Sequence, residues 1–110
     1  MTKVLHVQVG KEPQVVNVDF ENFGEVQKLI GDEPMVQAVR LEDSVFLYCD
    51  DDGISKELPQ NRLVPSIMES CIFGDFFLVK QSPETNEEVD LTEEDIKKWT
   101  KILSLENSKA

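Results

Sequence analysis

The stretch "IFGDFFLVK" (residues 72–80) decides the fold, because it predicts a strand with apolar side chains on both faces. Successive side chains of a strand alternate between the two faces of the sheet. The two apolar sets are Ile72, Phe76 and Leu78 on one face, and Phe73, Phe77 and Val79 on the other. Such a strand is typical of the interior of a sheet. We therefore expect it to be central, with a tight bend at Gly74-Asp75 near its start.

Two β-hairpins are expected before this strand. Residues 3–9 and residues 14–20 both alternate in the manner of strands, and the turn sequence "GKEP" separates them. Residues 34–41 and residues 44–50 are rich in β-forming side chains, with Glu42 and Asp43 between them. Each pair of segments is short and closely spaced in sequence, which favours antiparallel pairing.

Two helices are expected. Residues 19–31 have Asp19 as a candidate N-cap, apolar side chains at helical spacing, and Gly31 at the C-terminal cap position. The closing segment "LTEEDIKKWTKILSLE" has Thr92 as N-cap and Asp95 three residues later. Its acids precede its lysines, as the helix dipole favours. The inward-facing stripe of this second helix is expected to be Ile96, Trp99 and Leu103.

The order of these elements predicts an α+β fold. We expect a mainly antiparallel sheet of about five strands, with the two helices packed on one side of it. Residues 1–105 are expected to form a single domain, and residues 106–110 a frayed C-terminal tail. "ISKELPQNRLVPS" (54–66) contains two prolines and is expected to be an ordered, extended loop.

The net charge of the chain restricts the classes of partner that it is expected to bind. Eleven basic and twenty-two acidic residues give 11 − 22 = −11, which disfavours direct nucleic-acid binding, because such binding needs basic side chains at the phosphates. No segment has the length or apolarity of a membrane helix or a signal peptide, so a cytoplasmic protein with no membrane partner is expected. Cys49 and Cys71 are expected to be reduced. An exposed apolar sheet edge would allow a homodimer, and a monomer is the alternative.

The sequence provides no recognisable catalytic constellation, and we expect a non-enzymatic protein without cofactor or metal. "DDDG" (50–53) resembles part of a calcium loop, but alignment on Gly53 puts Tyr48 and Pro59 at the positions that need acidic ligands. It is better explained as a turn. His6 is the only histidine and is expected on a face of the sheet. A hydrolase that uses clustered carboxylates remains an alternative, and it predicts a divalent-metal requirement.

The loop "LPQNRLVP" (58–65) is one candidate binding site. Pro59 stiffens it, and Asn61 and Arg62 offer hydrogen-bond donors suited to a carboxylate or phosphate. This leads to one functional alternative, a regulatory domain that binds a small anionic ligand. In the structural alternative, Asn61 bonds the backbone of the turn and Arg62 pairs with a neighbouring acid.

The second candidate site is an acidic interaction surface. It comprises the aspartate turn and the acidic run before and into the last helix: Asp50, Asp51, Asp52, Glu84, Glu87, Glu88, Asp90, Glu93, Glu94 and Asp95. If the fold aligns these two groups, they would imitate the phosphates of a nucleic acid. A solvated loop followed by a normally capped helix would explain the same residues.

Several of these features together resemble a known family. They are the opening strand pair, "LPQNRLVP" after the "DDDG" turn, the strand "IFGDFFLVK" and the closing "LTEEDIKKW". The most specific are Pro59, Asn61 and Arg62 combined with Leu91, Thr92 and Asp95. With these the chain resembles the domain of unknown function 3846 family over nearly its whole length. The resemblance implies an origin in a bacteriophage, plasmid or other mobile element, and it implies no enzymatic activity.

The leading functional hypothesis is therefore a small acidic protein-interaction module. Its expected partner is a host protein with a basic surface, such as a nucleic-acid-processing or defence protein that the module would inhibit. Small size, strong acidity and the suspected family support this hypothesis.

Overall fold

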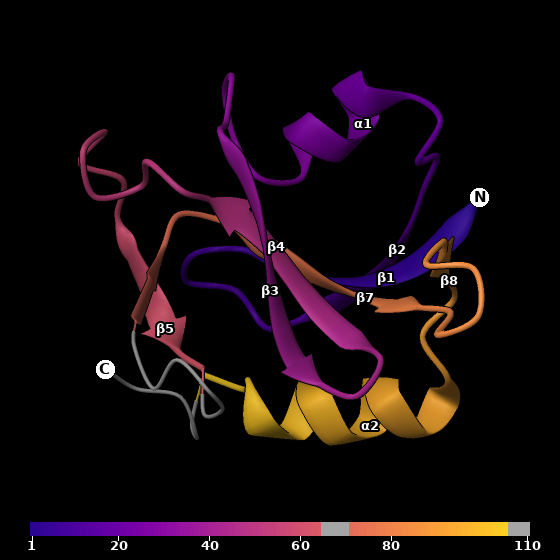
Figure 1. Cartoon of the computed structure of the whole chain (residues 1–110). Coiled ribbons are helices and arrows are strands. Elements are labelled where there is room, and N and C mark those ends of the chain that lie inside the picture. The colour runs from indigo at the N-terminus through magenta and orange to yellow at the C-terminus, as the bar shows by residue number, and fades with distance from the viewer. Residues whose placement is uncertain (65–70, 106–110) are drawn as a thin grey trace.

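A computed structural model describes residues 1–64 and 71–105 (Figure 1). The main sheet contains β1 (Thr2–Val7), β2 (Gln14–Val18), β3 (Val36–Glu42), β4 (Val45–Asp50), β7 (Phe76–Gln81) and β8 (Glu88–Val89). A second sheet consists of β5 (Gln60–Leu63) and β6 (Cys71–Phe73). The helices are α1 (Phe23–Lys28) and α2 (Glu93–Ile102). These elements confirm the α+β class. The expected tail, residues 106–110, lies outside the described residues.

Strand β7 is central, as its two apolar faces predict. The expected strand over residues 72–80 is interrupted at Gly74-Asp75, however, so Ile72 and Phe73 lie in β6 of the second sheet and not in the central strand. The strand order is β2-β1-β7-β4-β3, and every pairing is antiparallel. Leu78 of β7 lies opposite Leu5 of β1 on one side and opposite Leu47 of β4 on the other. The short strand β8 pairs with the end of β7, where Lys80 lies opposite Val89. Both expected hairpins, β1–β2 and β3–β4, are confirmed.

The helices lie on opposite faces of the sheet, so the expectation of both on one side is wrong (Figure 1). Trp99 of α2 packs in one apolar cluster with Phe76 and Leu78. Val26 of α1 packs in a second cluster with Phe77 and Val79. Because β7 is apolar on both faces, each face needs its own cover, and one helix provides it for each.

The helix boundaries differ in how well the sequence predicted them. In α2, the Thr92 hydroxyl accepts a hydrogen bond from the Asp95 amide and the Asp95 carboxylate accepts one from the Thr92 amide, which confirms the capping box. Helix α1 is shorter than expected and starts after Asn22 instead of Asp19. The Asp19 carboxylate accepts from the amide of Glu21 and so forms a turn before the helix.

Two segments expected to be loops contain strands. Gln60–Leu63, inside the proline-bounded segment, forms β5 and pairs with β6. Glu88–Val89, inside the expected turn region after β7, forms β8. His6 is buried in β1, and its Nε2 donates to the carbonyl oxygen of Leu29 after α1 at 2.7 Å. Within the described residues, no helix has the length and apolarity to cross a membrane.

Candidate functional site

The Asn61 side chain connects segments that are distant in the sequence. From β5, its Nδ2 donates to the carbonyl oxygen of Val7 at 3.0 Å and to that of Gly74 at 2.8 Å. Its Oδ1 accepts a hydrogen bond from Nε of Arg62 at 2.8 Å. Asn61 thereby fastens the small sheet to the end of β1 and to the bend between β6 and β7. Its amide nitrogen bonds backbone carbonyls, but these belong to distant segments, whereas the structural alternative expected the backbone of its own turn.

Arg62 is an interior residue with only 1% of its surface exposed. Its guanidinium donates to the carbonyl oxygen of Gln8 at 3.0 Å, and also to those of Lys11 and Leu103. Burial lowers the pKa of Arg62, although the negative charge of Glu12 acts in the opposite direction. Arg62 thus holds the β1–β2 turn against the end of α2.

These contacts correct the expectation of a recognition loop at residues 58–65. The carbonyl oxygen of the exposed Pro59 accepts a hydrogen bond from the Gly74 amide at 2.7 Å. Gly74 has a positive φ of 86°, and a Cβ there would lie 2.8 Å from Cδ1 of Leu58. Because Arg62 is buried and bound to backbone carbonyls, it is not placed to grip an anion, and Asn61 is committed in the same way. The described part of the segment, residues 58–64, is a structural connector, and Pro65 lies outside the described residues.

The aspartate turn also has a structural task, because the Asp50 side chain is buried. Its Oδ1 accepts from the amides of Met35 at 3.1 Å and Asp52 at 2.9 Å, and its Oδ2 lies 2.8 Å from Nζ of Lys56. Burial by itself raises the pKa of Asp50, but Lys56 and the two amides together lower it below its ordinary value. Asp50 is therefore not part of an exposed acidic surface, which corrects that expectation.

Eight other acids lie at one end of the molecule, which we call the acidic end. It consists of carboxylates after β2, around β8 and at the start of α2: Asp19, Glu21, Glu84, Glu87, Glu88, Asp90, Glu93 and Glu94. The register places these segments together, because Thr2 at the start of β1 lies opposite Val18. The Lys3 amide donates to Asp90 at 2.7 Å, which brings the start of α2 to the same place. In Figure 1 this end lies on the right, with the N-terminus and β8.

The aspartate turn lies at the other end of the sheet, so the two groups of acids do not form one surface. Val45 at the start of β4 lies opposite Lys80, which is also paired with β8, whereas the aspartates follow the far end of β4. A six-residue strand spans about 17 Å at about 3.4 Å per residue. Figure 1 shows this turn on the left, away from β8. Asp51 and Asp52 therefore lie far from the acidic end.

Asp19 and Glu21 belong to the acidic end but were not expected there. They line a hollow of roughly 480 Å³ together with Glu87 and Glu88. Tyr48 donates to Glu88 at 3.3 Å, and burial raises the pKa of Tyr48. The local sequence gives no signal that Asp19 and Glu21 lie near Glu87 and Glu88. Their proximity follows from the strand order β2-β1-β7, with β8 paired to β7.

Asp95 differs from its acidic neighbours because its carboxylate has partners. It caps α2 at Thr92 and lies 3.4 Å from Nζ of Lys80. Burial by itself raises the pKa of Asp95, but the hydrogen bonds with Thr92 and the charge of Lys80 lower it below its ordinary value. Asp95 therefore contributes to the stability of α2 more than to an exposed field.

The part of the chain that the structure describes offers little support for a metal site or for a reactive thiol. No group of three or more His, Cys, Asp or Glu side chains is arranged there to hold a metal ion. Cys49 and Cys71 are both free thiols. Burial, with added repulsion from Asp51 and Asp50, raises the pKa of Cys49 to about 11, which keeps this thiol protonated and unreactive at neutral pH.

Comparison with known proteins gives one match. The model of a family described as Domain of unknown function (DUF3846) matches residues 1–104. Neither the curated proteins nor the solved structures contain a match to this sequence.

Proposed function

We propose that this chain, which belongs to the DUF3846 family, is a non-enzymatic binding module whose acidic end docks on the basic surface of another protein. The observation that supports this proposal is the gathering of eight carboxylates at one end of the sheet, two of them from residues 19–21 and six from the distant run 84–94. Lys3 and Lys97 lie among these carboxylates and offset only part of their charge. Concentrated charge of one sign attracts a partner of the opposite sign and speeds its association.

We extend this proposal to the kind of partner. A protein that binds nucleic acid presents lysines and arginines to phosphates, and the same groups suit an exposed array of carboxylates. In a phage or mobile element, such a module would compete with nucleic acid for a host processing or defence protein and inhibit it. The module would act in the cytoplasm, and it would need no cofactor.

Neither alternative function is favoured by a contact in the structure. An anion-binding domain built on Asn61 and Arg62 needs a free guanidinium, and that of Arg62 donates to buried and partly buried carbonyl oxygens. A metal-dependent hydrolase needs converging ligands, and the described residues contain no such group. The acidic end thus remains the best supported site.

Two matched triple variants test the proposal. The first neutralises the acidic end by Glu84→Gln, Glu87→Gln and Glu94→Gln. The second neutralises exposed acids elsewhere, by Asp32→Asn, Asp51→Asn and Glu57→Gln. Both raise the net charge from −11 to −8 (−11 + 3), so they differ only in which surface loses charge.

The assay measures displacement of protamine, an arginine-rich protein, from a labelled DNA duplex. We expect the wild type and the second variant to displace it at similar concentrations, and the acidic-end variant to need about tenfold more. Three exposed ionic contacts of about 0.5 kcal/mol each give about 1.5 kcal/mol, or about a factor of ten. Equal weakening in both variants, or no displacement by the wild type at low salt, would overturn the proposal.

A further inference from the structure

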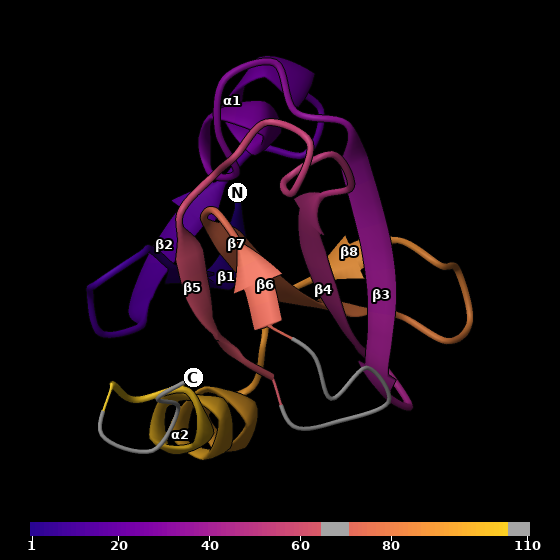
Figure 2. The ribbon, with the colours of Figure 1, turned by 90° about the vertical axis from the view of Figure 1, so that its left-hand side faces the viewer.

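Strand β2 is an unprotected edge of the main sheet. The strand order places β2 and β3 at the two sides of the sheet, as Figure 2 shows. The sequence of β2, "QVVNV", has no charge, no proline and no glycine, although 30% of the residues in the chain are charged. Among the described residues, no backbone hydrogen bond reaches β2 from its outer side. An uncharged edge of this kind is a template for a further strand.

The opposite edge, β3, carries the features that normally block such pairing. Its register with β4 shifts between Arg40 and Glu42, which marks a bulge or irregularity. Arg40 and Glu42 also place charges on this edge. In contrast, β2 pairs with β1 without a shift from Thr2↔Val18 to His6↔Gln14. The two edges therefore differ, and β2 is the one open to an added strand.

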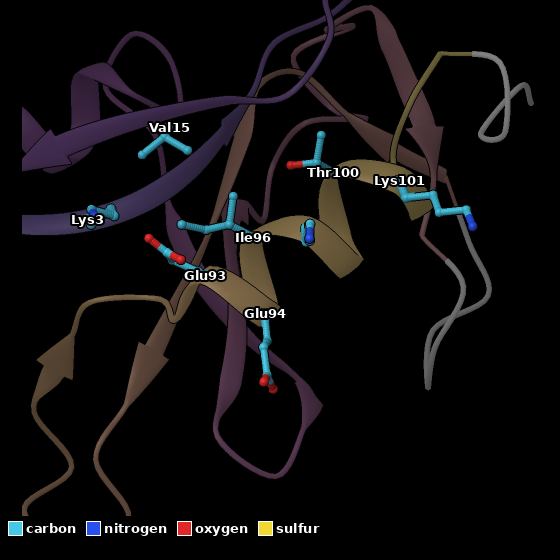
Figure 3. Close-up of a pocket in the computed structure, with 8 residues that line it drawn as sticks. Lys3, Val15, Glu93, Glu94, Ile96, Thr100 and Lys101 are labelled. Carbon is cyan, nitrogen blue, oxygen red and sulfur yellow. The ribbon is translucent and has the colours of Figure 1, made fainter.

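The face of β2 on the side of α2 borders an apolar groove. Val15 of β2, 47% exposed, lines this groove of roughly 650 Å³. Figure 3 shows Val15 on the sheet side of the groove and Ile96 and Thr100 on the helix side. A strand added beside β2 would cover Val15 and form a further wall of the groove. The apolar surface that it removes from water would stabilise the pairing.

We infer that the occupant of this edge is a second copy of the chain, paired antiparallel through β2 around a two-fold axis at Val16. In this register Val16 faces its own counterpart, Val15 faces Asn17, and Gln14 faces Val18. The pairing joins the two sheets into one continuous sheet, and an axis normal to the sheet leaves both copies of α2 on the same face. The interface is isologous, as in most homodimers.

Charge complementarity favours this antiparallel arrangement. The exposed Lys11 precedes β2 and the exposed Glu21 follows it, so each copy brings its Lys11 beside the Glu21 of the other. Glu12, which follows Lys11 in the β1–β2 turn, accepts a hydrogen bond from the Leu105 amide at 2.9 Å and is held toward the end of α2. Antiparallel pairing also places the two acidic ends at opposite ends of the dimer. Parallel pairing would bring them together, and their repulsion opposes it.

A pair of lysine variants tests the edge. Val15→Lys places a charge in the groove at β2, and Ala38→Lys places the same charge at an exposed position of β3. Each changes the net charge from −11 to −10, so the overall electrostatic repulsion between two copies of the chain falls equally in both variants. In sedimentation equilibrium we expect a dimer for the wild type and for Ala38→Lys, with the dimer dissociation constant at least about tenfold weaker for Val15→Lys. Circular dichroism verifies that each variant is folded.

A Val16→Cys variant tests the register, because paired residues of neighbouring strands lie close enough for a disulfide. With oxidised glutathione as oxidant, the expected product is a disulfide between two copies of the tryptic peptide 12–28, which contains neither Cys49 nor Cys71. A wild type that stays monomeric overturns the dimer. A dimer that Ala38→Lys disrupts and Val15→Lys does not, or one in which the two copies of peptide 12–28 form no disulfide, overturns the β2 interface.

Discussion

Replacing Arg62 by methionine is the sharpest test of its interior position. Methionine keeps most of the side-chain length and fills similar space, but it has no donors. The substitution leaves the carbonyl oxygens of Gln8, Lys11 and Leu103 without this partner. It also removes the hydrogen bond to Asn61, which orients the amide that holds β1 to the bend before β7.

The size of the effect follows from the burial of each acceptor. The hydrogen bond to Leu103 is buried, and an unsatisfied buried acceptor costs about 1–3 kcal/mol. The hydrogen bonds to Gln8 and Lys11 are partly buried, so water can replace the guanidinium there and each loss costs about 1 kcal/mol. The substitution also removes the buried positive charge of Arg62, and the desolvation cost that is avoided offsets part of this loss of stability. We expect a net loss of about 3 kcal/mol, a large share of the roughly 5–15 kcal/mol typical of a domain.

Urea unfolding followed by the fluorescence of Trp99 measures this loss. Trp99 is the only tryptophan, is buried, and donates from Nε1 to Glu42 at 2.7 Å, so its emission reports on the native core. Arg40→Met is the matched control, because the Arg40 side chain is 58% exposed and its ion pair with Asp43 is long, at 3.5 Å. We expect no change of midpoint for the control. Equal midpoints for the two variants would refute the structural role of Arg62.

Three further predictions concern the aspartate turn and its surroundings. Gly53→Ala should lower the free energy of unfolding by about 1–3 kcal/mol in calorimetry, because a Cβ would lie 2.9 Å from the carbonyl oxygen of Phe73. The pKa of Asp50 is lowered in the folded state, so its contribution is complete above the unfolded pKa of about 4 and is lost as pH falls through the folded value. The stability difference between the wild type and Asp50→Asn should therefore narrow in urea titrations below about pH 4, and a constant difference would contradict this. At pH 8, iodoacetamide should leave Cys49 unmodified in the native protein and alkylate it in urea, because burial raises its pKa to about 11.

The local pattern of side chains predicted several elements correctly. Strand β7 was expected at the centre because Phe77 and Leu78 belong to opposite apolar faces, and it is paired on both sides. The second helix was expected from Thr92 and Asp95, whose side chains reach only a few residues along the chain. Helix α1 was placed less well, because Asp19 can bond a nearby amide in a turn as easily as cap a helix.

The candidate sites were harder to predict, because their neighbours are distant in the sequence. Nothing beside Arg62 in the chain indicates that three carbonyl oxygens from other segments will surround it. The same holds for Asp50, whose burial depends on the amide of Met35 and on Lys56. An arginine or an aspartate has the same local sequence pattern whether its side chain is exposed or buried.

The sequence by itself determined the two hairpins, the central strand, the capped second helix, the fold class and the acidity, because periodicity and charge are properties of each segment. The sequence of β7 also indicated that both of its faces need to be covered, because its apolar side chains point to both. It did not reveal β5, which lies in the proline-bounded segment and pairs with β6, or β8, which is only two residues long. The tertiary structure alone decided which helix covers which face, that Asn61 and Arg62 turn inward, and that Asp19 meets Glu87 while the aspartate turn lies at the far end. These outcomes depend on the order and register of the strands, which long-range pairing sets.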